Sequence, residues 1–177
     1  MLDLQPLPEA CCEARIGDIR DREAVRAACA GAEVVFQTAA AVWEPGTHRD
    51  VYESINVEGN QIVVDTCREL GIERLVYTST IDVVVDGRTP IVDGDESLPY
   101  PATMPGDHYS RTKIEAEQLA GEFGRRGLDV AIVRPKTFIG PERLGVFEIL
   151  FDWIREGRRI PILGDGDNLY QLLAVED

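Results

Sequence analysis

The stretch His108-Tyr109-Ser110-Arg111-Thr112-Lys113 holds two side chains that can perform proton chemistry together. Tyr109 and Lys113 are four residues apart at the start of a helical pattern, so the phenol and the ammonium share one helix face. A free phenol has a pKa of about 10, and a nearby ammonium lowers that value by favouring the phenolate. A tyrosine tuned in this way can exchange a proton with a hydroxyl or a carbonyl. The pair is therefore a candidate acid–base site, although the same pair also occurs on ordinary solvated helices.

The composition indicates one soluble globular domain. The 177 residues are 44% hydrophobic and 28% charged, which is enough chain for a sizeable core. A net charge of −14 disfavours electrostatic binding to nucleic acid or to an anionic membrane. No apolar run has the length of a membrane span, and residues 1–6 do not form a secretory signal. We expect no nucleic-acid partner and no membrane span.

The four cysteines are Cys11, Cys12, Cys29 and Cys67. Their spacing fits no metal site, and the adjacent pair is awkward for a disulfide framework. We therefore predict reduced thiols, no metal and a cytoplasmic location.

Hydrophobic patterning predicts strands that alternate with helices. Strands are expected over 14–16, 33–38, 73–79, 129–134 and 169–175, and helices over 22–30, 50–70, 109–126 and 144–156. A polar, proline-rich segment over 85–107 is long enough to be functional or disordered. This order favours an α/β fold with a parallel sheet.

In an open parallel sheet, ligands bind beyond the carboxyl ends of the strands. The positions that follow the predicted strands are Asp18, 38–41, 79–82 and 135–137. Thr80 follows the strand over 73–79, and its hydroxyl can face the same pocket as Tyr109 and hold a substrate oxygen. The simpler alternative is that residues 78–80 are polar residues that end a strand.

Six ordered motifs give the chain a family resemblance. They are Gly17-Asp18-Ile19, Thr38-Ala39-Ala40, Asn56-Val57-Glu58-Gly59, Tyr77-Thr78-Ser79-Thr80, Tyr109-Ser110-Arg111-Thr112-Lys113 and Arg134-Pro135. Together they resemble an extended short-chain dehydrogenase/reductase of the NAD-dependent epimerase/dehydratase superfamily. Asp95-Glu96-Ser97-Leu98-Pro99-Tyr100 and the segment from Gly140-Pro141 to Gly164-Asp165-Gly166-Asp167-Asn168 are similar to the 3β-hydroxysteroid dehydrogenase-like branch.

The resemblance implies a fold and a reaction. The fold is a Rossmann-like doubly wound parallel sheet, here truncated at both ends, and residues 1–177 form a single dinucleotide-binding domain of which 140–177 enter the substrate-binding part. The reaction is hydride transfer between NAD(P) and a secondary alcohol or ketone. Tyr109 is the general acid/base and Lys113 lowers its pKa. Thr80 orients the substrate oxygen, and Ser79 is the alternative for that role.

The resemblance also implies a set of cofactor-binding residues. Lys113 bonds the nicotinamide ribose, Asp18 and Ile19 flank the adenine, and Asn56 supports the hydrogen-bond network of the site. Asp3 bonds the adenosine ribose and favours NAD over NADP, although a surface acid beside a loop is nearly as good an interpretation. The whole expected set is Asp3, Asp18, Ile19, Thr38, Ala39, Ala40, Asn56, Tyr109, Lys113, Pro135 and Thr137.

The chain departs from the family pattern at its beginning. The family carries a Gly-rich turn after a first strand, about thirty residues ahead of the acidic position, whereas two residues precede Asp3 here. That turn opens the helix that binds the pyrophosphate, and its strand lies in the middle of the sheet. We therefore interpret the chain as an internal fragment with unpaired sheet edges, or as a product with a misplaced start.

Three functions remain open. The leading one is an oxidoreductase for a small-molecule alcohol or ketone, which the apolar segment 146–154 suggests is hydrophobic, although core packing explains that segment better. The second is a nucleotide-sugar epimerase; Ile81-Asp82 after Thr80 differs from the Asp-Glu pair of dehydratases. The third is a non-catalytic dinucleotide-binding module. The resemblance further suggests a homodimer through the helices over 50–70 and 109–126.

Overall fold

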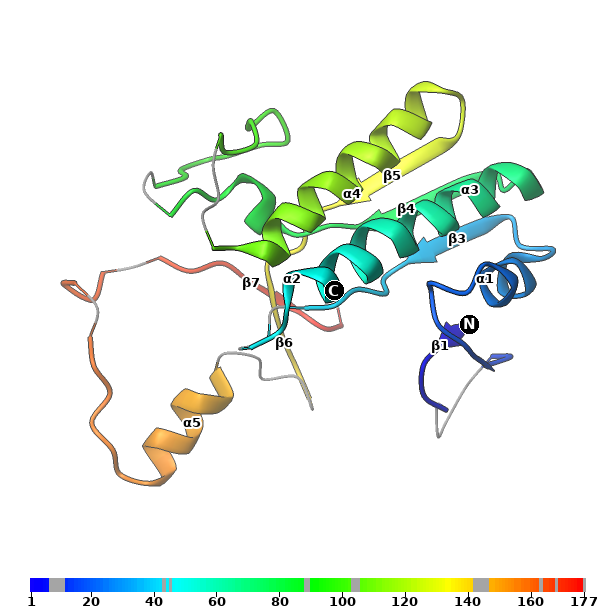
Figure 1. Cartoon of the computed structure of the whole chain (residues 1–177). Coiled ribbons are helices and arrows are strands. Elements are labelled where there is room, and N and C mark those ends of the chain that lie inside the picture. The colour runs from blue at the N-terminus through cyan, green and yellow to red at the C-terminus, as the bar shows by residue number, and fades with distance from the viewer. Residues whose placement is uncertain are drawn as a thin grey trace. The chain divides into compact units, whose positions relative to one another are not determined.

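The computed structural model describes residues 1–6, 12–42, 44, 46–87, 90–102, 106–141, 147–162, 164–167 and 169–176. The chain divides into two compact units, Met1–Arg134 and Pro135–Asp177 (Figure 1). The first unit contains Tyr109, Lys113 and Thr80, so the candidate acid–base site can be described within it.

The strands of the first unit pair in parallel, as the alternating pattern predicts. β3 (Val34–Gln37), β4 (Arg74–Thr78) and β5 (Asp129–Val133) form a three-stranded sheet in that order. β1 (Leu2–Asp3) and β2 (Arg15–Ile16) form a separate parallel pair. The α/β class is confirmed, but the expected sheet is present as two hydrogen-bonded sheets instead of one.

Three helices of this unit bury their apolar faces together. They are α1 (Arg22–Cys29), α3 (Asn60–Leu70) and α4 (His108–Arg125). Asp21 caps α1 by accepting from two backbone N–H groups, and Gly71 ends α3 in the left-handed conformation. The largest buried cluster unites α1, α3, α4 and β4 and consists of Val25, Cys29, Val63, Val64, Cys67, Ile72, Leu75 and Phe123.

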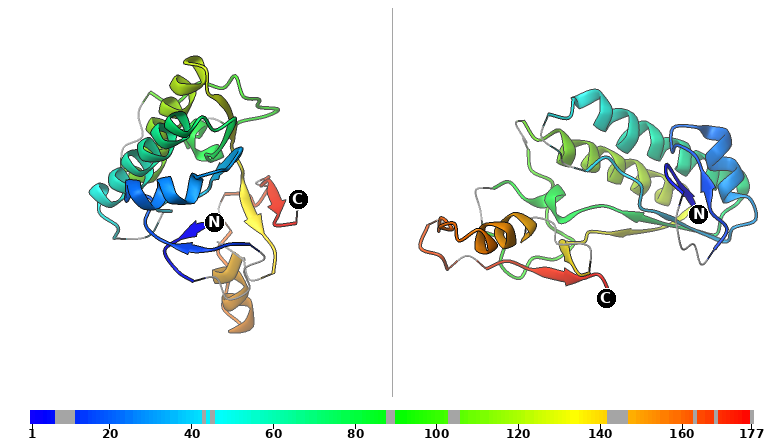
Figure 2. Two further views of the ribbon diagram at one scale, coloured as in Figure 1. Left: turned by 90° about the vertical axis from the view of Figure 1, so that its right-hand side faces the viewer. Right: turned by 90° about the horizontal axis from the view of Figure 1, so that it is seen from below.

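The helices shield one face of the three-stranded sheet. Figures 1 and 2 show α3 and α4 running along the same side of β3, β4 and β5. Leu75 and Tyr77 on that side are buried, whereas Val34, Phe36 and Val133 on the alternate positions are exposed, Phe36 by 70%. Because successive side chains of a strand point to opposite faces, the site-bearing helices all belong to one layer.

The helix expected over 50–70 is not uniform. It begins as α2 (Arg49–Tyr52), widens into the π-helix η1 (Glu53–Gly59) and continues as α3. Widened turns of this kind occur often at functional sites, and this one contains Asn56. Hydrophobic periodicity does not distinguish such a turn from an ordinary α-helix.

The second unit is small and open. β6 (Thr137–Ile139) pairs in parallel with β7 (Leu172–Ala174), and α5 (Phe147–Arg155) lies between them in sequence. Residues 144–146, where the helix was expected to begin, lie outside the described residues. Among the described residues, no helix combines the length and the apolar character that a bilayer crossing needs.

Candidate active site

Helix α4 carries both residues of the acid–base pair. The Asp107 carboxylate caps the helix by accepting from the Ser110 N–H at 2.9 Å, so the first turn is fixed where Tyr109 stands. Tyr109 is half-buried and Lys113, one turn later, is 3% exposed. The burial of a lysine shows that this face of α4 is not a merely solvated one.

The Lys113 ammonium is held by groups of β4. Nζ donates to the Thr78 carbonyl oxygen at 2.6 Å and lies 4.6 Å from the centre of the Tyr77 ring. Burial lowers the pKa of Lys113 to about 8, and the negative charge of Glu117 acts in the opposite direction. Lys113 therefore changes charge close to neutral pH, unlike a lysine in water.

The phenol of Tyr109 ionises less readily than that of a tyrosine in water. Its pKa lies above the ordinary value because burial disfavours the phenolate and the Asp82 carboxylate adds a negative field, with a smaller effect of the same sign from Asp107. The Thr80 side chain opposes the shift by hydrogen bonding. The Lys113 ammonium is directed at the Thr78 carbonyl in this structure, and the expected lowering of the Tyr109 pKa by Lys113 stays a prediction.

Thr80 lies beside Tyr109 at the carboxyl end of β4. It is the N-cap of the short 3₁₀-helix η2 (Ile81–Val84), where its Oγ1 accepts from the Asp82 N–H at 3.3 Å and donates to Asp82 Oδ2 at 3.1 Å. Ser79, the alternative, is buried, and its N–H donates to the Val133 carbonyl, which extends the pairing of β4 with β5. The interaction with Tyr109 favours Thr80 as the partner of the phenol.

Asn56 ties the loop after β3 to the catalytic helix. Its Oδ1 accepts from the Ala41 N–H at 2.8 Å, and its Nδ2 donates to the Ala41 carbonyl and to Thr112 Oγ1, both at 3.1 Å. Thr112 Oγ1 in turn donates to the Tyr109 carbonyl at 2.9 Å. The buried amide thus fixes the loop that contains the expected cofactor residues Thr38, Ala39 and Ala40, of which the first two are exposed.

The same π-helix contacts a further residue of the expected cofactor-binding set, Ile19, and Gly59 makes this contact possible. A Cβ at Gly59 would lie 2.8 Å from a methyl carbon of Ile19, so only glycine permits this contact. Ile19 also packs against the main core cluster. Asp18 accepts from the Arg20 backbone and guanidinium, and these hydrogen bonds lower the pKa of the Asp18 carboxyl.

Asp3 ends β1 beside the strand that leads to Asp18. Its carbonyl accepts from the Gly17 N–H at 2.9 Å, and its exposed carboxylate accepts from the Gln5 N–H at 2.9 Å. Two of the expected acids therefore follow neighbouring parallel strands.

Pro135 and Thr137 belong to the second unit. Thr137 Oγ1 and the Tyr170 hydroxyl share a hydrogen bond of 2.6 Å, and the Lys136 ammonium lies 4.8 Å from the centre of the same ring. Their expected position near the nicotinamide stays a prediction.

A buried ion pair lies next to the acid–base pair and was not foreseen. Glu117 accepts from Arg134 Nη2 at 2.5 Å and from the Tyr100 hydroxyl at 2.8 Å, with side-chain exposures of 1% for Glu117 and 18% for Arg134. Burial alone raises the pKa of this carboxyl, but the hydrogen bonds and the Arg134 charge outweigh it, so the net pKa is lowered. The four-residue spacing from Lys113 to Glu117 was the available signal in the sequence.

The fold and the site define a class. A parallel α/β sheet with Thr80 at a strand end, facing a tyrosine and a lysine one turn apart on α4, is the arrangement of a Rossmann-fold short-chain dehydrogenase/reductase. The double-mutant dTDP-glucose 4,6-dehydratase DesIV of Streptomyces venezuelae, crystallised with NAD bound, shares this fold. It is 26% identical with a TM-score of 0.71, over 95% of this chain and 53% of that one.

The sequence model of the 3-beta hydroxysteroid dehydrogenase/isomerase family matches residues 9–177, and the chain belongs to that family. The 3beta-hydroxysteroid-dehydrogenase/decarboxylase isoform 2 of Arabidopsis thaliana is 42% identical over 90% of this chain and 28% of its own length. The decarboxylating sterol-4-alpha-carboxylate 3-dehydrogenase of Mus musculus is 32% identical over 92% of this chain and 44% of its own length. The chain thus spans less than half the length of these two relatives.

Proposed function

We propose that the whole protein is an NAD-dependent oxidoreductase that interconverts a secondary alcohol and a ketone on a hydrophobic, sterol-like molecule. The observation that carries the proposal is the convergence of Thr80, Tyr109 and Lys113 at the carboxyl end of β4. The names of the relatives support it, since one is a 3beta-hydroxysteroid-dehydrogenase/decarboxylase and another is a decarboxylating sterol-4-alpha-carboxylate 3-dehydrogenase.

The residues present suit the adenosine half of a dinucleotide. Asp3 and Asp18 place carboxylates after neighbouring strands, where they would accept from ribose hydroxyls and from the adenine amine. Thr38 and Ala39 are exposed in the loop after β3, and Gly59 lets the π-helix η1 pack directly against Ile19. When bound, NAD supplies the hydride acceptor, and an acidic residue at Asp3 favours NAD over NADP.

The chain's own groups move the proton. The Thr80 hydroxyl turns from Asp82 and donates to the substrate oxygen, which holds that oxygen beside Tyr109, and the phenolate form of Tyr109 takes the proton of the substrate hydroxyl during oxidation. The raised pKa of Tyr109 in this structure means that the phenolate needs additional stabilisation, which the Lys113 ammonium supplies if it turns from the Thr78 carbonyl toward the phenol. Asn56 keeps α4 and the loop after β3 in register.

The test is NADH formation by the whole protein from a 3-hydroxysterol, with NADH binding followed by fluorescence on the whole protein and on the 177-residue chain. We expect Tyr109→Phe to lower kcat by about 10²- to 10⁴-fold, the usual contribution of a general acid/base. Glu122→Gln, which alters only an exposed ion pair near the end of the same helix, should leave kcat unchanged. An unchanged rate in Tyr109→Phe, or no turnover of any sterol alcohol, would contradict the proposal.

A homodimer and the alternative epimerase activity are also proposals. A homodimer would form through α3 and α4, and sedimentation of the whole protein tests it. A nucleotide-sugar epimerase would retain NAD tightly during purification and regenerate it in each turnover, so net NADH accumulation distinguishes the dehydrogenase from it.

A further inference from the structure

Tyr52 lies against the ring of Tyr109, although the proton chemistry of the site assigns it no role. It ends α2 and is 3% exposed, in a region where α2 packs against α4 (Figure 1). The centres of the Tyr52 and Tyr109 rings are 6.4 Å apart, and the two ring planes meet at 62°. Aromatic pairs favour this edge-to-face geometry. The buried ring therefore limits the directions in which the Tyr109 phenol can point.

The hydroxyl of Tyr52 binds a different element, the loop after β3. Its oxygen accepts from the Glu44 N–H at 3.1 Å and donates to the Glu44 carbonyl at 3.4 Å. Glu44 is exposed, and residues 38–40 of the same loop belong to the expected cofactor-binding set. One side chain thus connects this loop with the phenol of Tyr109, through its hydroxyl at one end and its ring at the other.

Tyr52 and Asn56 make the same pattern of contacts from positions four residues apart. Asn56 binds the N–H and the carbonyl of Ala41, and through a threonine hydroxyl of α4 it is linked to the Tyr109 backbone. Tyr52 binds the N–H and the carbonyl of Glu44 and contacts the ring of Tyr109. Asn56 therefore acts on the backbone of the acid–base residue, whereas Tyr52 acts on the orientation of its side chain.

The orientation of the phenol decides whether its proton can be transferred. Thr80 hydrogen-bonds the phenol, and a substrate oxygen must come within about 2.6–3.2 Å of the phenol oxygen for transfer. A ring that turned freely about its side-chain bonds would spend part of its time away from that position. A favourable aromatic pair changes the occupancy of one orientation by about 2- to 10-fold. The contact with Tyr52 is therefore large enough to affect the rate.

We propose that Tyr52 is a positioning residue of this site, whose ring holds the Tyr109 phenol toward Thr80 and whose hydroxyl holds the loop after β3. The inference rests on the proposed oxidoreductase function and adds to it a residue that acts through Tyr109. Tyr52 transfers no proton itself, because its hydroxyl is bound to the Glu44 backbone. Different atoms of one side chain perform the two tasks, so two substitutions can separate them.

The test measures kcat and the KM for NAD in the whole protein with a 3-hydroxysterol. Tyr52→Phe keeps the ring and removes the hydroxyl, so kcat should stay within about twofold while the KM for NAD rises by about 2- to 10-fold. Tyr52→Leu removes the ring as well and should lower kcat by about tenfold, because the phenol loses its preferred orientation. Phe123→Leu is the matched control, since Phe123 is a buried aromatic residue near the other end of α4. It should leave kcat and KM per folded molecule unchanged.

Hydrogen exchange of the loop gives a second readout, which needs neither cofactor nor turnover. In Tyr52→Phe the Glu44 N–H loses its acceptor, so its exchange should accelerate by about 2- to 10-fold. The Ala41 N–H, which Asn56 binds, should exchange at the wild-type rate and is the internal control.

The outcomes separate the two proposals. No turnover by the wild-type protein contradicts the proposed function and the positioning role together. An unchanged kcat in Tyr52→Leu, or equal losses in Tyr52→Leu and Phe123→Leu, contradicts the role of Tyr52 alone and leaves the oxidoreductase standing. An unchanged exchange rate of the Glu44 N–H in Tyr52→Phe contradicts the hold on the loop. Should Tyr52→Leu fail to fold, Tyr52→Met provides the same comparison, because it removes the ring and fills more of its space.

Discussion

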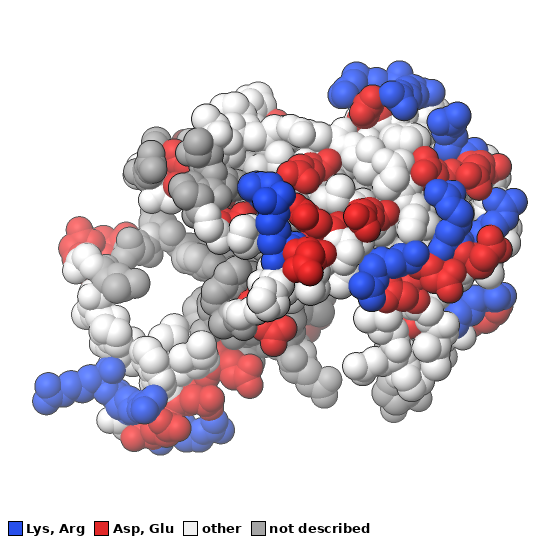
Figure 3. All heavy atoms as spheres, viewed as in Figure 1, with Lys and Arg blue, Asp and Glu red and all other residues white. Residues whose placement is uncertain are grey.

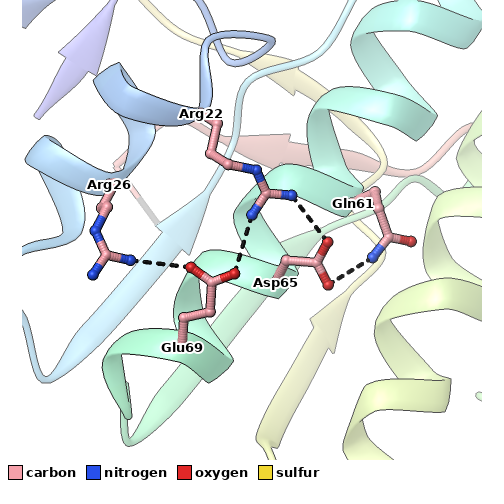
Figure 4. A network of polar contacts seen from close by, with 5 residues as sticks. All are labelled: Arg22, Arg26, Gln61, Asp65 and Glu69. Atoms are coloured by element: carbon pink, nitrogen blue, oxygen red, sulfur yellow. Dashed lines mark hydrogen bonds and ion pairs between the residues drawn. The ribbon is translucent and has the colours of Figure 1, made fainter.

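Two ionic clusters of the first unit use the same chemical groups in opposite surroundings. At the carboxyl end of β5, Arg134 pairs with Glu117 at side-chain exposures of 18% and 1%. Between α1 and α3, Arg22 and Arg26 pair with Asp65 and Glu69 at exposures of 29–51% (Figure 4). Figure 3 shows basic and acidic side chains interspersed over the face that carries these two helices. Only the buried cluster lies within reach of the acid–base pair.

The two clusters differ in how much stability the protein loses when one member of the cluster is removed. A buried charge without its partner is costly, because neither water nor a counter-ion replaces the lost contact. Glu117 also acts on Lys113, one turn earlier on α4, where its charge favours the ammonium against burial. An exposed pair is replaced by water at little cost. The same residue types thus position the site in one place and join two helices in the other.

The largest effect is expected at Glu117. Glu117→Gln leaves the half-buried Arg134 guanidinium and the Tyr100 hydroxyl without their carboxylate, and the free energy of unfolding should fall by about 3–5 kcal/mol. Urea denaturation measures the change. Glu122→Gln on the same helix removes an acid from the exposed pair with Arg126 and is the matched control. Its loss should stay below about 1 kcal/mol.

A second variant separates charge from packing in that experiment. Replacing both partners, as in Glu117→Leu with Arg134→Met, removes the unpaired charge and should recover much of the loss. Equal losses in Glu117→Gln and Glu122→Gln would mean that burial does not distinguish the two clusters.

The next largest effect is a pH dependence of the free energy of unfolding, which arises from Lys113 beside the buried cluster. The pKa of Lys113 is about 8 in the folded protein, below the ordinary 10.5, so the unfolded chain binds more protons between these values. Stability therefore rises with pH from about 8 to 10, by at most roughly 3 kcal/mol. Above pH 10 the raised pKa values of Tyr77 and Tyr109 act in the opposite direction, because the unfolded tyrosines ionise first.

Denaturation at several pH values between 7 and 10 measures this slope. Lys113→Met should abolish it, whereas Lys136→Met, at the other lysine of the sequence, should retain it. The same slope in the wild type and in Lys113→Met would show that the buried ammonium is not its source. If the ammonium assists Tyr109, oxidoreductase activity should decline over the same pH range as Lys113 loses its proton.

The sequence was sufficient to predict the features of the fold and the site that depend on local contacts or on strand order. The four-residue spacing placed Tyr109 and Lys113 one turn apart on a helix, and the strand-end rule brought Thr80 beside Tyr109. The pattern of apolar runs gave parallel pairing of β3, β4 and β5. These features depend on periodicity and chain order, which a single sequence contains.

The sequence was insufficient to predict contacts between segments that are distant from one another in the chain. The partners of Glu117 lie 17 residues away on either side, in the polar segment over 85–107 and after β5, and no spacing rule joins them. The direction of the Lys113 ammonium depends on the Thr78 carbonyl, a backbone group that every residue has. The widened turn at Asn56 depends on the amide contacts with Ala41, which hydrophobic periodicity does not encode.

The smallest effect is expected in the exposed network, and it completes the comparison. Glu69 accepts from Arg22 and Arg26 at 3.2 Å and 3.0 Å, with half of its side chain exposed. Glu69→Gln should lower the free energy of unfolding by no more than about 1 kcal/mol, and 1 M salt should remove most of the difference. Denaturation in low and high salt measures both. Glu117→Gln, whose pair is shielded from solvent, should keep most of its loss at the same salt concentration. If salt removed both losses equally, the buried pair would be as accessible to ions as the exposed one, and the contrast between the clusters would not hold.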